Sequence, residues 1–336
     1  MKVPATPFPE LSEIYTARNR LQGLAIHSPL IKLNTQDAER EIYLKLENLQ
    51  PIGVFKIRCI GNLLMSKTPQ QLKAGVYTAS SGNSGYAMAW MANRLGIPAR
   101  VYAPPDAPES KRRQIQSAGA ELISVPYRTW WEIIQQQDYP DDPGLYINAV
   151  GDPAALAGNA TIGLEILEDL PNVETLVIPF GGGGVSCGIA SSIAALKPDT
   201  QILGAECETA TPLAAALESG HPVAVEHTES FISGIGSTQV LPYMWPLVRR
   251  CIKASVIVSL EAVAKAVHDL FTHQRIVAED AGATALAAAR KLVDSRITSG
   301  PVVAVITGGN IDRLHMLEIL QGRVPDPRRI DTQGSS

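Results

Sequence analysis

Short apolar runs recur along the chain and end at turn-forming residues. Segments 175–180 (Thr-Leu-Val-Ile-Pro-Phe) and 302–306 (Val-Val-Ala-Val-Ile) are almost wholly apolar. Continuous runs of this kind are typical of strands in a parallel sheet that is covered on both faces. Segment 41–47 instead alternates apolar and charged residues, which predicts a half-buried strand. Further strands are predicted at 75–79, 99–103, 121–125 and 201–205.

Between these strands, apolar residues recur at helical spacing. Strands that alternate with helices predict an α/β fold with mostly parallel, open, twisted sheets flanked by helices. The basic run Lys111–Arg113 is interpreted as an exposed helix face, and Thr129 as an N-cap. Helices are predicted at 9–24, from 61 onward, at 86–95, 110–118 and 129–137, up to 170, and at 185–196.

Composition narrows the class of protein. Of the 336 residues, 45% are hydrophobic and 18% are charged, which suits a soluble globular enzyme. The net charge of -4 and an aromatic content of 5% argue against nucleic acid and anionic membranes as partners. The four cysteines are scattered, as expected of free thiols in a reducing compartment. The N-terminal residues do not resemble a signal peptide, so we expect a cytoplasmic protein.

The first candidate for chemistry is Lys56, which follows a Pro51–Gly53 turn and has Phe55 and Ile57 as neighbours. Dry surroundings would disfavour the ammonium form and make the amine a nucleophile. A lysine whose stem packs on apolar neighbours while its head reaches water explains the same pattern. This stretch alone leaves both interpretations open.

Three loops follow predicted strands, where α/β sheets bind ligands. Gly181–Gly184 stands between an apolar strand and a helix, and its free N–H groups favour a phosphate over a tight-packing turn. It matches neither GxGxxG nor GxxxxGK[ST], so the phosphate belongs to a smaller molecule than a dinucleotide. Ser80–Gly85 offers hydroxyls and amides for a carboxylate, although an N-cap turn is equally consistent. Thr307 places a hydroxyl beside two glycines.

A nucleophilic lysine, a small phosphate and a carboxylate together suggest pyridoxal phosphate with an amino acid. From about residue 11 to 320 the sequence resembles the fold-type II pyridoxal-phosphate enzymes, closest to the threonine/serine dehydratase and serine racemase group. The motifs occur in the family's order: Val54–Arg58, Ser80–Asn83, Gly119–Ala120, Ala157–Glu165, Gly181–Gly184, Glu279–Gly282 and Thr307–Asn310.

The resemblance implies a role for each site residue. Lys56 would form the Schiff base with the cofactor and shuttle the α-proton, and Phe55 would pack beside the ring. Asn83 would hydrogen-bond the 3′-oxygen, and Thr307 would contact the ring nitrogen. Gly181, Gly182, Gly183 and Gly184 would cradle the phosphate, and Gly234 would lie beside the cofactor. The substrate would contact Ser80, Ser81, Gly82, Asn83 and Ser84, with Ser81 where racemases carry a second base.

The resemblance further implies a dehydratase, an ammonia-lyase that converts a β-hydroxy amino acid such as L-threonine or L-serine into a 2-oxo acid and ammonia. A hydroxyl at Thr307 would leave the ring nitrogen largely neutral, which suits β-elimination. Racemisation, β-replacement and a non-catalytic cofactor-binding relative are the alternatives. A homodimer is the family expectation. The large cofactor domain is predicted at 1–52 plus 149–325, the small domain at 53–148, and a disordered tail at 326–336.

The chain departs from the family pattern at two positions. Ser84 replaces the usual histidine after Ser-Gly-Asn, which puts the substrate in question. Family members with a metal site use a glutamate, a backbone carbonyl and an aspartate six residues after the glutamate. Glu206 and Ala210 match the first two, but the third position is Pro212, so we expect the divalent site to be lost unless Glu208 offers an oxygen. We also expect no C-terminal regulatory domain.

Overall fold

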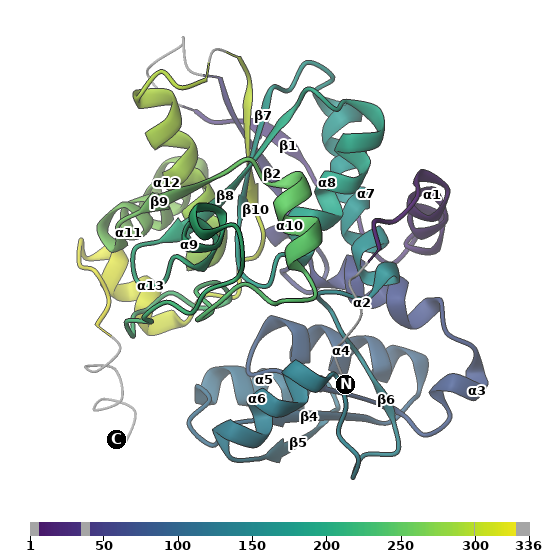
Figure 1. Cartoon of the computed structure of the whole chain (residues 1–336). Helices are drawn as coiled ribbons and strands as arrows, with labels where there is room; N and C mark the ends of the chain where they lie inside the picture. The colour runs from purple at the N-terminus through teal and green to yellow at the C-terminus, as the bar shows by residue number, and fades with distance from the viewer. Residues whose placement is uncertain (1–6, 35–40, 299, 327–336) are drawn as a thin grey trace.

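The protein is described here by a computed structural model that covers residues 7–34, 41–298 and 300–326 (Figure 1). Within these residues, six strands form a large sheet in the order β1-β2-β10-β7-β8-β9, and four form a small sheet in the order β5-β4-β3-β6. We call each sheet with its helices the large and the small lobe. Of the predicted disordered tail, residues 327–336 lie outside the described part.

The large sheet is parallel except for its first strand. β1 pairs antiparallel with β2, and each later pair is parallel. The strands are β1 (Leu30–Lys32), β2 (Ile42–Leu46), β7 (Thr175–Pro179), β8 (Gln201–Cys207), β9 (Ala254–Val258) and β10 (Val302–Ile306).

Helices cover both faces of this sheet. Ile178 and Val305 point into the apolar cluster that contains residues of α7 (Pro153–Asp169) and α8 (Gly184–Leu196). Val177 and Ala304 point into the opposite cluster, with α11 (Leu260–Asp269) and α12 (Asp280–Asp294). Because both faces are dry, β7 and β10 are buried along their whole length, as their continuous apolar sequences predict.

The small sheet is parallel throughout and consists of β3 (Val76–Ala79), β4 (Ala99–Ala103), β5 (Glu121–Ser124) and β6 (Leu145–Tyr146). The predicted α/β class with mostly parallel sheets is confirmed. The domain boundaries at 52/53 and 148/149 stay a prediction, although the chain does pass from the large sheet to the small one between β2 and β3 and back between β6 and β7.

The remaining helices pack around these sheets. α4 (Asn83–Leu95), α5 (Glu109–Ser117) and α6 (Tyr127–Gln136) belong to the small lobe. The others are α1 (Leu11–Arg20), α2 (Lys56–Met65), α3 (Pro69–Leu72), α9 (Pro212–Ser219), α10 (Trp245–Cys251) and α13 (Arg313–Leu320), with short helical turns at Glu47–Leu49 and Leu270–Gln274. None of the described helices is long and apolar enough to cross a membrane.

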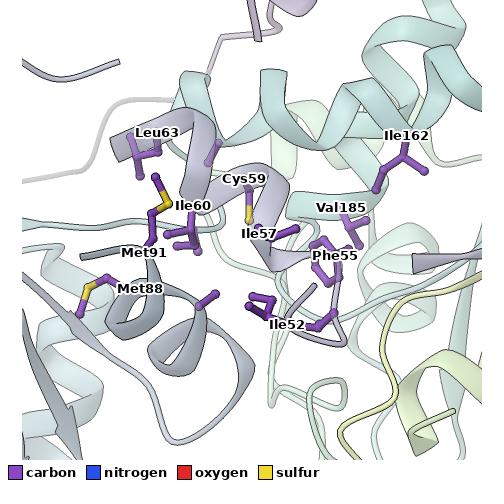
Figure 2. Close-up of a cluster of buried hydrophobic side chains, with 14 of the residues drawn as sticks. Ile52, Phe55, Ile57, Cys59, Ile60, Leu63, Met88, Met91, Ile162 and Val185 are labelled. Atoms are coloured by element: carbon purple, nitrogen blue, oxygen red, sulfur yellow. The ribbon is translucent and has the colours of Figure 1, made fainter. Parts of the chain in front are cut away.

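Helix α2 joins the two lobes, because it packs on α7 of the large lobe and on α4 of the small lobe. Figure 2 shows Ile60 and Leu63 of α2 near Met91 of α4, in the apolar cluster that also holds Ile162 of α7. The predicted start of this helix at residue 61 is wrong. The helix begins at Lys56, so the lysine occupies a fixed position in its first turn.

Three further local predictions are wrong. α4 begins at Asn83 rather than at residue 86, so the end of the serine-rich loop is already helical. α6 begins at Tyr127 after Pro126, which excludes Thr129 as its N-cap. Lys45 does not face solvent from a half-buried strand but is fully buried. The burial of Lys45 arises from its ion pair with Glu165, a distant partner that the local pattern does not encode.

Candidate active site

The turn that carries Lys56 is joined to the loop after β10 by backbone hydrogen bonds. The Phe55 N–H donates to the Thr307 carbonyl at 2.9 Å, and the Gly309 N–H donates to the Gly53 carbonyl at 2.8 Å. Val54 forms an antiparallel bridge with Gly308 between them. Two predicted site residues that are 251 positions apart in sequence, Lys56 and Thr307, therefore lie at one junction.

Lys56 is half-buried, and its Nζ lies 4.8 Å from the centroid of the Phe55 ring. Phe55 is 8% exposed and packs in the apolar cluster of α2, near Val185 (Figure 2). The amine therefore sits against an aromatic face rather than in open solvent. Lys56 therefore has the apolar surroundings that its sequence neighbours predict.

A network of buried charges anchors α2 two residues after the lysine. Arg58 donates to both oxygens of Glu47 at 2.8 Å and to the two oxygens of Glu165 at 2.7 and 2.8 Å. Lys45 contacts Glu165 at 2.8 Å. The burial of Arg58 lowers its pKa, but Glu47 and Glu165 more than offset this, so the pKa of Arg58 is raised. The network fixes the first turn of α2 to β2 and α7.

The four glycines after β7 form a tight cradle at the N-terminus of α8. A Cβ on Gly181 would lie 2.8 Å from the Gly234 carbonyl, and one on Gly184 would lie 2.8 Å from the Val150 carbonyl. Gly183 has φ +87°, which favours glycine. Among the described residues, the buried Ser186 hydroxyl in the first turn of α8 has no hydrogen-bond partner. Bare backbone at a helix N-terminus fits a phosphate group.

The serine-rich loop caps α4. The Ser80 hydroxyl accepts the N–H groups of Gly82 at 3.3 Å and Gly85 at 3.1 Å. The hydroxyls of Ser81 and Ser84 are on half-buried residues and have no hydrogen-bond partner within the described part of the chain. Ser80 thus shapes the turn, while Ser81 and Ser84 leave their hydroxyls available to a ligand.

Asn83 links the two lobes through residues to which the sequence assigned no role. Its Nδ2 donates to both oxygens of Glu279 at 3.0 and 2.9 Å, and its Oδ1 accepts from Asn310 at 3.0 Å. Glu279 immediately precedes α12, and Asn310 follows Thr307. The motifs Glu279–Gly282 and Thr307–Asn310 were visible in the sequence, but nothing local pairs them with Asn83.

Glu279 and Asp280 are adjacent buried acids, 4% and 2% exposed. Burial and, to a lesser degree, the charge of Asp280 raise the pKa of Glu279 to about 7, against the opposing effects of Asn83, Lys111 and Lys56. Burial also raises the pKa of Asp280, which accepts the Ser233 N–H at 2.7 Å and the Ser233 hydroxyl at 3.2 Å. Ser233 precedes Gly234, so this pair of acids borders the glycine cradle.

Lys111 is half-buried, although its basic run predicts an exposed face. Its Nζ lies 3.9 Å from the point where a Cβ on Gly82 would stand. Within the described residues it forms no ion pair shorter than 4 Å, yet its charge acts on Glu279 and Asp280. The prediction holds for Arg113, whose side chain is 76% exposed. Lys111 therefore brings a cation over the serine-rich loop.

Two other regions, the end of β8 and a cavity along β9, contain none of the predicted cofactor residues. Glu206 and Ala210 lie at the end of β8 and in the turn after it. No group of three or more His, Cys, Asp or Glu side chains among the described residues is placed to hold a metal ion. A cavity of about 580 Å³ lies along β9 and is lined by Lys253, Ser255 and Lys291, among others. It contains none of the predicted site residues.

Comparisons with known proteins agree with this geometry. The family model described as "Pyridoxal-phosphate dependent enzyme" matches residues 22–308. The L-threonine ammonia-lyase of Thermotoga maritima is 34% identical over 295 residues, covering 86% of this chain and 72% of that protein. The catabolic L-threonine dehydratase TdcB of Escherichia coli strain K12 is 31% identical over 313 residues, covering 92% of this chain and 95% of that protein.

The fold has close structural neighbours as well. The structure of maize serine racemase superimposes with a TM-score of 0.85 at 26% identity, covering 94% of this chain and 98% of the other. The family match and the order of the motifs lead to the same conclusion, and the structure brings Lys56, Asn83 and the loop of Thr307 together. The chain belongs to the family of pyridoxal-phosphate-dependent enzymes, fold type II.

Proposed function

We propose that this protein is an ammonia-lyase that removes water and then ammonia from a β-hydroxy amino acid such as L-threonine or L-serine. The observation that carries the proposal is the position of Lys56, in the first turn of α2, on the Phe55 ring and beside Thr307. The relatives that are 31–36% identical and carry the names L-threonine ammonia-lyase or dehydratase support it.

The cradle and its surroundings fit pyridoxal phosphate. Gly181–Gly184 would hold the phosphate at the N-terminus of α8, where a side chain would clash with backbone and a buried hydroxyl, that of Ser186, lacks a partner. Asn83 would bind the 3′-oxygen, Thr307 the ring nitrogen, and Lys56 would hold the cofactor covalently through Nζ. The chemistry that the cofactor supplies when bound is withdrawal of electrons from the α-carbon of the amino acid.

The protein's own residues then position and move protons. Lys56 Nζ, as a free amine, takes the α-proton, and the β-hydroxyl leaves with a proton as water. One water is added back when ammonia is released, so the net products are a 2-oxo acid and ammonia. The Thr307 hydroxyl, in place of an arginine or an aspartate, would leave the ring nitrogen of the bound cofactor largely neutral.

The substrate carboxylate would lie at the serine-rich loop. The free hydroxyls of Ser81 and Ser84 and the N-terminus of α4 offer donors there. We add Lys111 to this set, because its unpaired Nζ lies over Gly82 at the centre of the loop. An ammonium there would stabilise a carboxylate in a partly desolvated cleft.

Racemisation is the second candidate activity, because the maize serine racemase structure superimposes so closely. Ser81 would supply the second base on the opposite face of the substrate. A serine hydroxyl is a weak base unless its proton has an acceptor, and within the described residues no hydrogen bond links the Ser81 hydroxyl to one. We therefore rank racemisation below elimination. Nothing in the described structure favours β-replacement, and an intact Lys56 argues against a non-catalytic relative.

The decisive experiment compares Lys56→Ala with Lys73→Ala, which changes an exposed lysine. The wild type and Lys73→Ala should release 2-oxo acid from at least one β-hydroxy amino acid, whereas Lys56→Ala should lose more than about 1,000-fold in rate. The visible absorbance of the bound cofactor should change in Lys56→Ala alone. If no β-hydroxy amino acid reacts while a thiol plus an activated serine does, the lyase proposal is wrong.

The proposal also covers the compartment and the oligomeric state of the protein. We propose a cytoplasmic location, supported by the four free cysteines, all of which lie in the described part of the chain. We also propose a homodimer, which rests on the family resemblance. Light scattering on the purified protein measures the oligomer directly, and a mass of about 36 kDa, that of one chain, would contradict it.

A further inference from the structure

The end of β8 matches two of the three positions at which related enzymes hold a divalent cation. Glu206 provides the carboxylate, and Ala210 provides the backbone carbonyl four residues later. The third position is Pro212, which has no side-chain oxygen and is the first residue of α9. The contacts of Glu206 and Glu208 show whether these two carboxylates could hold a cation.

Glu206 is 1% exposed, and its carboxylate is directed at the N-terminus of α9. One oxygen accepts the Leu213 N–H at 2.7 Å, and the other accepts the Ala214 N–H at 3.0 Å. The second oxygen also accepts the Ser255 hydroxyl at 2.6 Å, from β9. Leu213 and Ala214 are the second and third residues of α9, whose N–H groups have no partner within the helix. Three donors and the positive end of the helix dipole therefore stabilise this carboxylate, although burial still raises the pKa of Glu206 above its ordinary value.

Pro212 belongs to the same arrangement. Proline is favoured at the first position of a helix because its missing N–H would have no partner there. The substitution that removes the third metal ligand thus also sets the start of α9, directly against Glu206.

Glu208 does not replace the missing oxygen. It is exposed, and its carboxylate accepts the N–H of Leu260, the first residue of α11, at 2.9 Å. Both acids therefore cap helices: Glu206, near the end of β8, caps α9, and Glu208, just after β8, caps α11. A divalent cation needs about six oxygen ligands. The two carboxylates are directed at different helices and do not converge on one point.

We propose that in this chain the N-terminus of α9 takes the place of the divalent cation. Glu206 is compensated by the Leu213 and Ala214 N–H groups and the Ser255 hydroxyl, and it binds no metal ion. The helix keeps the end of β8 attached to α9 and β9 irrespective of the cation concentration. Stability is then independent of divalent cations, whichever reaction the enzyme catalyses.

The test is a thermal melt of the purified holoenzyme in chelator, and in 1 mM Mg²⁺, Ca²⁺ or Mn²⁺. We expect Tm values within about 1 °C of each other, because a cation that does not bind the folded state cannot stabilise it. Elemental analysis after gel filtration should find less than about 0.1 metal ion per chain. A cation present at 100 times its Kd would raise the Tm of a chain of 336 residues by about 4 °C. Such a rise, or one ion per chain, would overturn the proposal.

Variants separate the helix contact from a metal contact. Glu206→Gln keeps the shape but removes the charge and one acceptor, so Tm should fall by about 4 °C or more, equally in chelator and in Mg²⁺. Ser255→Ala removes a single donor, so its Tm should fall by less than that of Glu206→Gln. This variant keeps the test informative if Glu206→Gln does not fold. The matched control is Glu208→Gln, an exposed cap with an expected change below about 2 °C. A fall in Glu206→Gln that appears only when Mg²⁺ is present would contradict the proposal.

Discussion

Two clusters of buried charge differ in how their charges are paired. In the first, Arg58 and Lys45 face Glu47 and Glu165, and each cation contacts a carboxylate at 2.8 Å or less. In the second, the adjacent acids Glu279 and Asp280 are bonded to the neutral groups of Asn83 and Ser233. All of these residues are at most 7% exposed, apart from the neutral partners.

The charge state of each buried acid depends on whether its partners are charged or neutral. Although burial raises the pKa of Glu165, Arg58 and Lys45 more than offset it, so that the pKa is lowered and the acid stays ionised. Glu279 has no cation in contact, and burial raises its pKa to about 7. A buried acid with an ion-pair partner is held in one state, whereas a buried acid with neutral partners titrates near neutrality. The first cluster therefore fixes α2, and the second can change charge beside the ligand site.

The largest effect is expected when the paired cluster is broken. Arg58→Met leaves Glu47 and Glu165 buried, with Lys45 as the one cation still contacting Glu165. Removing one partner of a buried ion pair costs about 3–5 kcal/mol. We expect urea denaturation to show a loss of this size in the free energy of unfolding, or a protein that does not fold.

The control for Arg58→Met is Arg18→Met, which breaks an exposed arginine–glutamate pair with Glu168. Its side chains are 41% and 44% exposed, and such pairs contribute about 1 kcal/mol or less. Adding Glu47→Gln to Arg58→Met should restore part of the loss, because Arg58 is the cation that pairs with Glu47, whereas Glu165 keeps its contact with Lys45. Equal losses for the two arginines would contradict the assignment of the network as the anchor of α2.

The second prediction concerns the unpaired acid. A carboxyl whose pKa is raised by folding stabilises the folded state fully at low pH, and this stability is lost as the pH rises. For Glu279, with a pKa raised from 4.5 to about 7, the loss falls between pH 4.5 and 7 and amounts to about 3 kcal/mol. Glu279→Gln cannot ionise, so its unfolding free energy should gain about this much relative to wild type between pH 4.5 and 8.

Glu168→Gln is the control for this pH dependence, since Glu168 is an exposed acid. Its unfolding free energy should follow the wild-type curve from pH 4.5 to 8 within about 0.5 kcal/mol. Should Glu279→Gln run parallel to wild type over the whole range, Glu279 would be ionised throughout and the contrast between the two clusters would disappear.

The sequence predicts the parallel strands well because dry apolar runs need no distant information. The strands at 99–103 and 302–306 coincide with β4 and β10. The glycine loop is also local in the sequence, and the structure places it at the N-terminus of α8. The role of Lys56 depends on the family resemblance and stays a prediction. The start of α2 is different, since the bridge of Val54 to Gly308 sets it.

The errors at charged residues have the same origin. An alternating strand pattern cannot show that Lys45 meets Glu165, which lies 120 residues later. Likewise, Asn83 is 196 residues from Glu279, so their hydrogen bonds have no local signal. The pairing of a buried charge, on which its pKa depends, is therefore the property that the sequence conveys least.

The smallest effect on stability is expected at Lys111, whose charge acts on Glu279 and Asp280 without an ion-pair contact. Its main effect is expected on substrate binding. Lys111→Met should raise KM for the amino acid by about tenfold and leave kcat within about twofold, if the lysine binds the carboxylate equally before and during reaction. Arg113→Met, on the exposed face of the same helix, should change neither constant. Because the charge of Lys111 lowers the pKa of Glu279, its removal should also extend the pH range of stability loss upward. An unchanged KM with an unchanged pH profile would place Lys111 outside the site, since both readouts depend on its charge over Gly82.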